Sequence, residues 1–221
     1  MDRLEAIRQR HSVRQYTDRP IEPEVLQALQ EEVAACNRES GLHIQLVTNE
    51  PKAFDSRMAH YGKFSGVKNY LALIGKKSAD LDELCGYYGE RLALKAQQLG
   101  LNSCWVAMTY KKIPDAFQVG PGEKLTVVIA LGYGQTQGEP HKSKPADKVS
   151  NFSASSPAWF RAGVEAALLA PTAMNQQKFQ LRQEGNTVSA KAGLGFYTKV
   201  DLGIVKYHFT CAAGRDNFSW Q

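Results

Sequence analysis

The chain has 221 residues, of which 43% are hydrophobic and 22% are charged, as is typical of a soluble globular protein. This length allows one well-packed domain or two small ones. No run approaches the roughly 20 apolar residues of a membrane span, and the charged start, residues 1–5, lacks the apolar core of a signal peptide. We therefore expect a cytoplasmic protein without a membrane partner.

The net charge of +5 suggests anionic partners. The basic residues are dispersed and form no block interleaved with aromatics, so a phosphate-bearing small molecule fits better than a nucleic acid. The four cysteines form no CxxC pair, and no histidine lies at metal-ligand spacing from them. We expect Cys36, Cys85, Cys104 and Cys211 to be buried, reduced thiols, and we expect no metal site.

Helices and strands are predicted from the start of the chain to Gly134. Apolar positions four apart, such as Val25, Leu29 and Val33, predict helices, whereas the continuous apolar run 125–131 predicts a buried central strand. The basic stretch 52–68 is expected to be a mobile loop. The predicted helices are 4–7, 23–36 and 80–99. The predicted strands are 44–47, 70–75, 103–107 and 125–131.

The rest of the chain begins with a polar linker, 135–156. A helix at 157–169, a turn at 170–177, a hairpin at 178–192 and a helix at 201–213 are predicted to follow. The apolar pattern of the helix and strand in 25–46 matches, position by position, that of 160–181. This similarity suggests an internal duplication, although any helix–strand pair shares part of it.

Residues 10–14 form the first candidate site. In extended backbone Arg10, Ser12 and Arg14 point to the same side, so two guanidiniums and a hydroxyl would converge on a phosphate or on ribityl and ring oxygens. The alternative is a solvated basic turn at the end of the first helix, where cations are favoured.

Three further segments carry polar or backbone groups that could bind a ligand. The turn 170–177 could hydrogen-bond the edge of a planar heterocycle, or could simply connect a helix to a strand. Lys142 and Lys144 form either a phosphate site or a solvated charge pair. The strand 104–108 could act through backbone N–H groups at its end, or could be buried core.

No nucleophile or general-base constellation stands out. The five histidines are scattered, and GxSxG, GxGxxG and Walker motifs are absent. A chain so poor in catalytic side chains suggests that a cofactor does the chemistry. We therefore assign no catalytic side chain.

Together these segments resemble the nitroreductase family of FMN flavoproteins. The resemblance rests on residues 10–16 with Pro20 and Ile21, on 97–106, on 129–133 and on 142–145, all in family order, and on the turn 170–177. It implies an α+β fold with a central mixed β-sheet flanked by helices. Residues 1–149 would form the FMN-binding core, and 150–221 would be a helix-turn-hairpin-helix extension that completes the flavin site.

The resemblance also implies the cofactor-binding residues. Arg10, Ser12 and Arg14 would contact the phosphate, the ribityl chain and the pyrimidine edge, and the backbone amide of Ala107 would lie near flavin N5. The full set is Arg10, His11, Ser12, Arg14, Trp105, Val106, Ala107, Met108, Lys142, Lys144, Pro171, Thr172, Ala173, Asn175 and Gln177.

In most of the family a proline–asparagine turn follows the first long helix, and a homodimer shares each flavin. Here residues 36–40 stand in that place, and the turn comes only at 170–177, as in a divergent subgroup. Residues 171–177 could therefore contact the flavin of their own subunit or of the partner.

The function that the resemblance implies is hydride transfer from NADH or NADPH, through FMN, to a nitroaromatic, quinone or similar small-molecule acceptor. Two alternatives stay open. One is another flavoenzyme reaction on the same fold, either dehalogenation or oxygen-dependent oxidation. The other is a protein that binds a flavin or another phosphorylated ligand without turnover.

Overall fold

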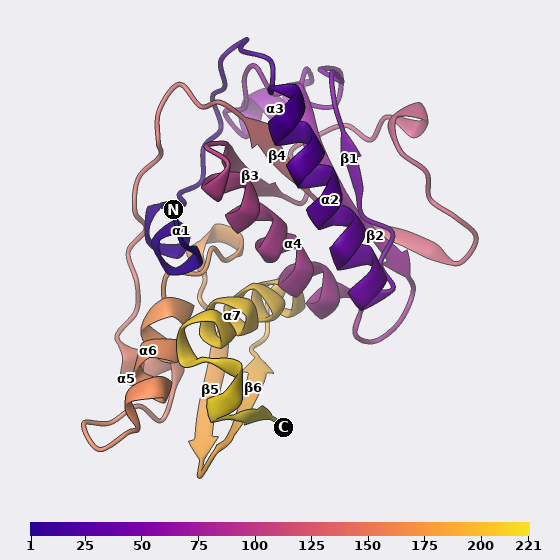
Figure 1. Ribbon diagram of the computed structural model, residues 1–221. Helices are drawn as coiled ribbons and strands as arrows, with labels where there is room; N and C mark the ends of the chain where they lie inside the picture. Colours follow the sequence, from indigo (N-terminus) through magenta and orange to yellow (C-terminus); the bar gives the residue numbers. More distant parts are fainter.

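The computed structural model describes residues 1–221 and has the expected α+β architecture (Figure 1). The helices are α1 (Arg3–Gln9), α2 (Pro23–Ser40), α3 (Arg57–Tyr61), α4 (Leu81–Gln98), α5 (Ala146–Val149), α6 (Ala158–Ala167) and α7 (Thr198–Ala213). The strands are β1 (Gln45–Val47), β2 (Asn69–Lys76), β3 (Asn102–Val106), β4 (Glu123–Gly132), β5 (Phe179–Glu184), β6 (Thr187–Ala192) and β7 (Ser219–Trp220).

Four strands form the central sheet in the order β1-β2-β4-β3, and every pair in it is antiparallel. A bridge between Ser12 and Ser103 adds parallel pairing at the edge of this sheet. A second sheet has the order β5-β6-β7, in which β7 runs parallel to β6. In Figure 1 the central sheet occupies the upper part of the molecule with α2 and α4, and the hairpin β5–β6 lies at the lower end with α6 and α7.

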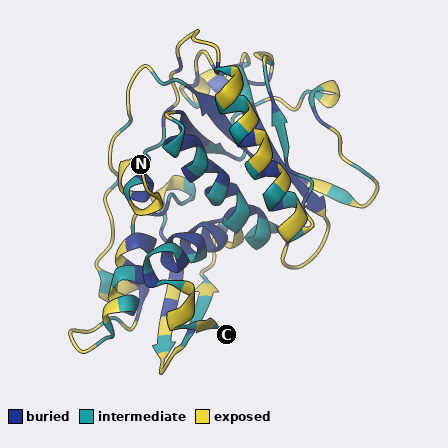
Figure 2. Cartoon of the chain, in the orientation of Figure 1, coloured by how far each residue is buried: buried dark blue, intermediate teal, exposed yellow.

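Helices α4 and α7 are the buried helices that join these two parts (Figure 2). In α7, 12 of the 16 residues are buried. In contrast, α2 has charged residues on the face that points to solvent. One hydrophobic core draws residues from both parts of the chain, including Leu29 and Leu92 from the first and Phe160 and Phe209 from the second. Burial of these apolar side chains is the main force that holds the two parts together.

The predicted elements are all present, with shifted ends and additional short elements. Helix α2 begins at Pro23 and ends before Gly41, whose φ of 71° favours glycine. Helix α7 begins slightly earlier than predicted, directly after Tyr197 in the left-handed region. The stretch 52–68 contains the short helix α3, because the Ser56 hydroxyl accepts a hydrogen bond from the Ala59 amide. The polar linker contains α5, the turn 170–177 contains a 3-10 turn, and β7 forms near the C-terminus.

None of the helices combines the length and the apolar character needed to cross a bilayer. Cys36, Cys85 and Cys104 are buried and Cys211 is half-buried, and none of the four is in a disulfide. Burial raises the pKa of the Cys36 and Cys85 thiols to about 12, so these two thiols are protonated at neutral pH.

Candidate functional site

Two adjoining cavities lie between the N-terminal segment, the end of β3 and the start of α7. The first, of about 400 Å³, is mostly apolar, and the second, of about 490 Å³, is lined mostly by polar residues. They share five lining residues and therefore form one elongated site with an apolar end and a cationic end. The shared residues are Ser12, Arg14, Pro171, Thr172 and Met174.

The segment 10–14 has extended backbone because it pairs with the edge of β3. The Val13 amide donates to the Ser103 carbonyl at 3.0 Å, and the Val13 side chain is buried on the sheet side. The alternation of an extended chain then turns Ser12 and Arg14 toward the cavities. The structure thus brings Arg10, Ser12 and Arg14 to one site, as the spacing predicts.

Arg10 is unusual because its side chain is only 2% exposed. Its Nε lies 3.5 Å from Oε1 of Glu90, and neither Nε nor Nη1 has a hydrogen-bond partner. Arg10 nevertheless lines the second cavity. A buried guanidinium with unpaired N–H groups is costly unless an anion completes its hydrogen bonds.

The second cavity is cationic overall. His11, His141 and Arg14 line it with Arg10, and Glu139 is the one acidic residue in its wall. Burial and the positive charge of Arg10 lower the pKa of His11, which is the response expected of a cation-rich pocket. The chemistry of this wall suits an anion such as a phosphate.

Glu90 lies behind both cavities and is fully buried. Its Oε2 accepts the indole N–H of Trp105 at 2.8 Å, and its Oε1 lies 2.9 Å from Nε2 of His208. Although burial raises the pKa of Glu90, the hydrogen bond to His208 and the charge of Arg10 outweigh it, and the net effect lowers that pKa. Glu90 is therefore an anion that fixes one residue in each wall, Arg10 and Trp105.

The end of β3 supplies part of the apolar cavity. Cys104 and Val106 are buried in the hydrophobic core, which is the second of the two roles considered for the strand 104–108. Trp105 faces the other side and lines the cavity, as do Ala107 and Met108, which follow the end of the strand. Val106 contributes to the cavity wall as well.

The turn 170–177 forms the opposite wall. Pro171, Thr172 and Ala173 line the apolar cavity, and Asn175 lines the cationic one. The turn is strained, because Met174, Asn175 and Gln177 all have φ between 44° and 53°. Backbone in this conformation is stable only where side chains and backbone from other segments hold it by hydrogen bonds.

Part of this support comes from Gln177, which is 3% exposed and lines neither cavity. Its amide donates to the Lys142 carbonyl at 2.9 Å and accepts from the Lys144 amide at 2.8 Å. The Lys144 ammonium donates to the carbonyls of Gln176 and Gln177 at 2.8 and 3.0 Å. The structure therefore places Gln177, Lys142 and Lys144 beside the site, where they hold the turn, and not in its lining.

Asp201 gives the other support and was missed by the sequence reasoning. It lies at the start of α7, is 3% exposed, and lines the apolar cavity. Its Oδ1 accepts the Ala173 amide at 2.9 Å, and its Oδ2 accepts from Nε2 of Gln176 at 2.7 Å. Burial raises its pKa to about 6 despite these hydrogen bonds. An isolated aspartate in the apolar run 200–205 was the signal that could have revealed it.

Several other lining residues were not predicted, because they come from segments without a motif. Gly62 and Phe64 follow α3, Tyr197 and Ile204 lie at the start of α7, and His141 lies in the linker. Arg14 lies 6.0 Å from the centre of the Phe64 ring, which places a cation over an aromatic face at the border of the two cavities.

The fold is that of the nitroreductase class of α+β proteins. A family model described as "Putative TM nitroreductase" matches residues 2–213, and the chain belongs to this family. No match was found among curated proteins.

Solved structures agree with this assignment of the fold. A "putative nitroreductase" from Thermotoga maritima is 23% identical with a TM-score of 0.67, and the match covers 98% of this chain and 85% of that one. A "putative nitroreductase in complex with FMN" from Desulfovibrio desulfuricans is 18% identical with a TM-score of 0.53, covering 67% of this chain and 95% of that one. A "Putative NADH dehydrogenase/NAD(P)H nitroreductase" from Parabacteroides distasonis is 24% identical with a TM-score of 0.52, covering 66% and 95%.

Proposed function

We propose that this protein binds FMN in the elongated site and transfers hydride from NADH or NADPH to a nitroaromatic, quinone or similar acceptor. The observation that carries the proposal is Arg10, a buried guanidinium that pairs with Glu90 and lies in the wall of a cationic cavity that adjoins an apolar one. Family membership supports it, as do the FMN in the Desulfovibrio desulfuricans complex and the NAD(P)H in the description of the Parabacteroides distasonis protein.

The residues present fit FMN at both ends. At the cationic end a phosphate would meet the guanidinium of Arg10, with the Ser12 hydroxyl as a further donor. At the apolar end Phe64, Trp105 and Pro171 offer the kind of surface that a planar ring system requires. Arg14 lines both cavities, so its charge is available to the polar edge of the ring.

Bound FMN would supply the redox chemistry, since flavin N5 accepts and donates hydride. The protein's own contribution is binding and electrostatics. The guanidinium of Arg14, which lines both cavities, would stabilise negative charge on the ring edge. Trp105 is held by its hydrogen bond to Glu90, and the turn 171–173 by its hydrogen bond to Asp201, so both walls are preorganised.

Both walls come from one chain. The segment 10–14 and β3 belong to the first part, and the turn 170–177 and α7 belong to the second. We infer that residues 171–175 contact the flavin of their own chain and that a partner subunit is not needed to close the site. Association into a homodimer stays a prediction.

The test begins with equilibrium titration of the purified protein with FMN and with riboflavin, which lacks the phosphate. We expect a yellow complex that bleaches anaerobically with NADH or NADPH and recovers its colour on addition of a nitroaromatic. Arg10→Gln should weaken FMN binding at least tenfold and riboflavin binding much less, because only FMN carries the phosphate that Arg10 would bind. Arg38→Gln, an exposed arginine on α2, is the matched control.

A protein that takes up no FMN would overturn the proposal. A bound flavin that neither nicotinamide reduces would instead identify a flavin-binding protein without turnover. Formation of product only in the presence of oxygen would favour an oxygen-dependent oxidation on the same fold.

A further inference from the structure

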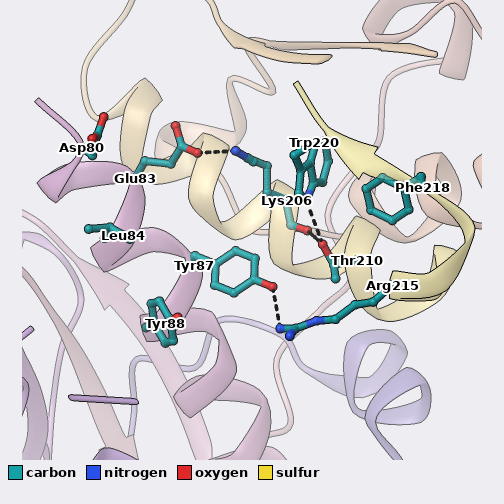
Figure 3. A pocket seen from close by; sticks show the side chains of 10 residues that line it. All are labelled: Asp80, Glu83, Leu84, Tyr87, Tyr88, Lys206, Thr210, Arg215, Phe218 and Trp220. Carbon is teal, nitrogen blue, oxygen red and sulfur yellow. Dashed lines mark hydrogen bonds and ion pairs between the residues drawn. The ribbon is translucent and has the colours of Figure 1, made fainter. Parts of the chain in front are cut away.

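A third cavity, separate from the elongated site, lies between the start of α4, the end of α7 and the C-terminal residues (Figure 3). Its volume is about 600 Å³, which is within the range of small-molecule pockets. Neither the segment 10–14 nor the turn 170–177 contributes to it. Its origin follows from the way in which α4 and α7 cross.

The two helices touch at Gly86 and Gly203, and the contact is reciprocal. A methyl group at position 86 would overlap the carbonyl oxygen of Val200, and one at position 203 would overlap the carbonyl oxygen of Glu83. Each glycine thus meets the residue three positions before the other glycine. This is the relation that a local two-fold axis through the crossing produces, with residue n of α4 equivalent to residue n + 117 of α7.

This local symmetry relates the third cavity to the apolar end of the elongated site. Four residues near the start of α7 line the apolar cavity: Tyr197, Val200, Asp201 and Ile204. Their equivalents near the start of α4 all line the third cavity: Asp80, Glu83, Leu84 and Tyr87.

The strands that follow the two helices each place a tryptophan in a cavity wall, outside the n + 117 register of the helices. Trp105 of β3 lines the apolar cavity, and Trp220 of β7 lines the third cavity. Each indole N–H donates to a side chain of the preceding helix, Trp105 to Glu90 at 2.8 Å and Trp220 to Thr210 at 3.3 Å. Because these four helix positions are equivalent, the third cavity is the structural counterpart of the cavity that we assign to the flavin ring.

The chemistry of the counterpart differs, because it has no equivalent of the 10–14 segment in its wall. Aromatic rings surround it instead, and Figure 3 shows Tyr87, Phe218 and Trp220 around the open space. The ammonium of Lys206 is neutralised by Glu83 at 2.6 Å. Arg215 forms no ion pair, and its guanidinium donates to the Tyr87 hydroxyl at 3.2 Å.

We propose that this cavity is a second ligand site and that it binds a small planar aromatic carboxylate. The rings would cover the faces of the ligand, and Arg215, the one cation of the lining that forms no ion pair, would bind its carboxylate. Asp80, the acidic lining residue that forms no ion pair, lies on the opposite side of the cavity from Arg215 (Figure 3). The absence of a second free cation in the wall argues against a doubly charged phosphate ester. This site stands independently of flavin binding.

The test uses 2-naphthoate as the probe and protein labelled with ¹⁵N, both with and without saturating FMN. The three indole N–H signals are assigned by Trp→Phe substitutions at 105, 159 and 220. We expect 2-naphthoate to shift the Trp220 signal saturably and to leave Trp105 less affected. Arg215→Gln should weaken binding about tenfold, as should replacement of the probe by neutral 2-naphthamide. Arg182→Gln, an exposed arginine on β5, should have no effect.

Three results would overturn the proposal. The first is an unchanged Trp220 signal at millimolar probe. The second is a response confined to Trp105, which would place the probe in the other site. The third is equal binding of 2-naphthoate and 2-naphthamide to wild type and to the Arg215→Gln variant, because the charge would then play no part.

Discussion

Oε1 of Glu90 lies 2.9 Å from Nε2 of His208 in the interior of the protein, where both side chains are fully buried. Nδ1 of His208 lies 3.0 Å from the Ala166 carbonyl, which only accepts, so Nδ1 carries a proton. One further proton therefore lies between Glu90 and His208. The pair joins α4 to α7, and through Glu90 it reaches both Arg10 and Trp105 in the walls of the site.

Replacing Glu90 by glutamine should destabilise the protein strongly. The substitution keeps the shape but removes the anion, so the buried charge of Arg10 loses its compensation, and losses of about 3–5 kcal/mol are typical of broken buried pairs. Urea unfolding at pH 7 measures the change in the free energy of unfolding. Glu24→Gln, at an exposed position of α2, should change it by less than about 0.5 kcal/mol. Equal effects of the two substitutions would contradict this interpretation of the cluster.

Asp201 should make stability fall as the pH rises from about 4 to 6. Its folded-state pKa of about 6 exceeds the ordinary value of 3.8, so the folded protein holds a proton that the unfolded chain has lost in this range. A difference of about two pKa units corresponds to about 3 kcal/mol. The Asp201→Asn variant lacks this group. As the pH rises from about 4 to 6, its free energy of unfolding should therefore increase by about 2–3 kcal/mol relative to that of wild type, and the difference should stay constant above pH 6. If the difference in unfolding free energy between the variant and wild type does not vary with pH, the pKa of Asp201 is not raised in the folded protein.

The crossing of α4 and α7 should reverse the usual preference for alanine within helices. Gly→Ala in a helix normally stabilises by about 1 kcal/mol. At Gly86 or Gly203 the added methyl group would overlap backbone atoms of the opposite helix, so we expect each substitution to destabilise by several kcal/mol or to prevent folding. Thermal unfolding measures the effect, and Ala34→Gly on the exposed face of α2 calibrates the intrinsic helix preference. A stabilised Gly86→Ala variant would show that the helices are not in close contact there.

Flavin binding should need only one chain. Because both walls of the elongated site come from the same chain, we expect one FMN per chain and no loss of affinity when the protein is diluted to the monomer. Sedimentation velocity recorded at the flavin absorbance band reports the mass of the species that carries FMN. Release of FMN on dissociation to monomers would mean that a partner subunit completes the site.

Some helices and strands were predicted correctly because their sequence patterns depend on neighbouring residues alone. The four-residue spacing of Val25, Leu29 and Val33 predicted α2, and the apolar run 125–131 predicted β4, because burial on one face or on both faces imposes these periods. The ends were less accurate. The start of α7 depends on Tyr197, whose left-handed backbone no local pattern indicates.

The residues of the candidate site also fall into those that sequence spacing predicted and those that it did not. Alternation within residues 10–14 predicted that Arg10, Ser12 and Arg14 share one side of the chain, and pairing with β3 gives this segment the extended backbone that alternation assumes. Spacing did not reveal that Lys142, Lys144 and Gln177 hold the turn and do not line the cavity. Their hydrogen bonds join segments that are distant in the sequence, and only the folded chain brings these segments together.

The sequence by itself determined the family, the α+β class and the segments that carry the arginines and the turn, because these are written in adjacent residues. Only the tertiary structure decided that the segment 10–14 and the turn 170–177 meet at one site, that Glu90 and Asp201 hold its walls in place, and that a local two-fold axis relates the third cavity to the apolar cavity. Each of these depends on where α4 and α7 cross. That crossing is set by backbone contact at Gly86 and Gly203, two residues distant in the sequence, whose lack of a side chain leaves no pattern along the chain.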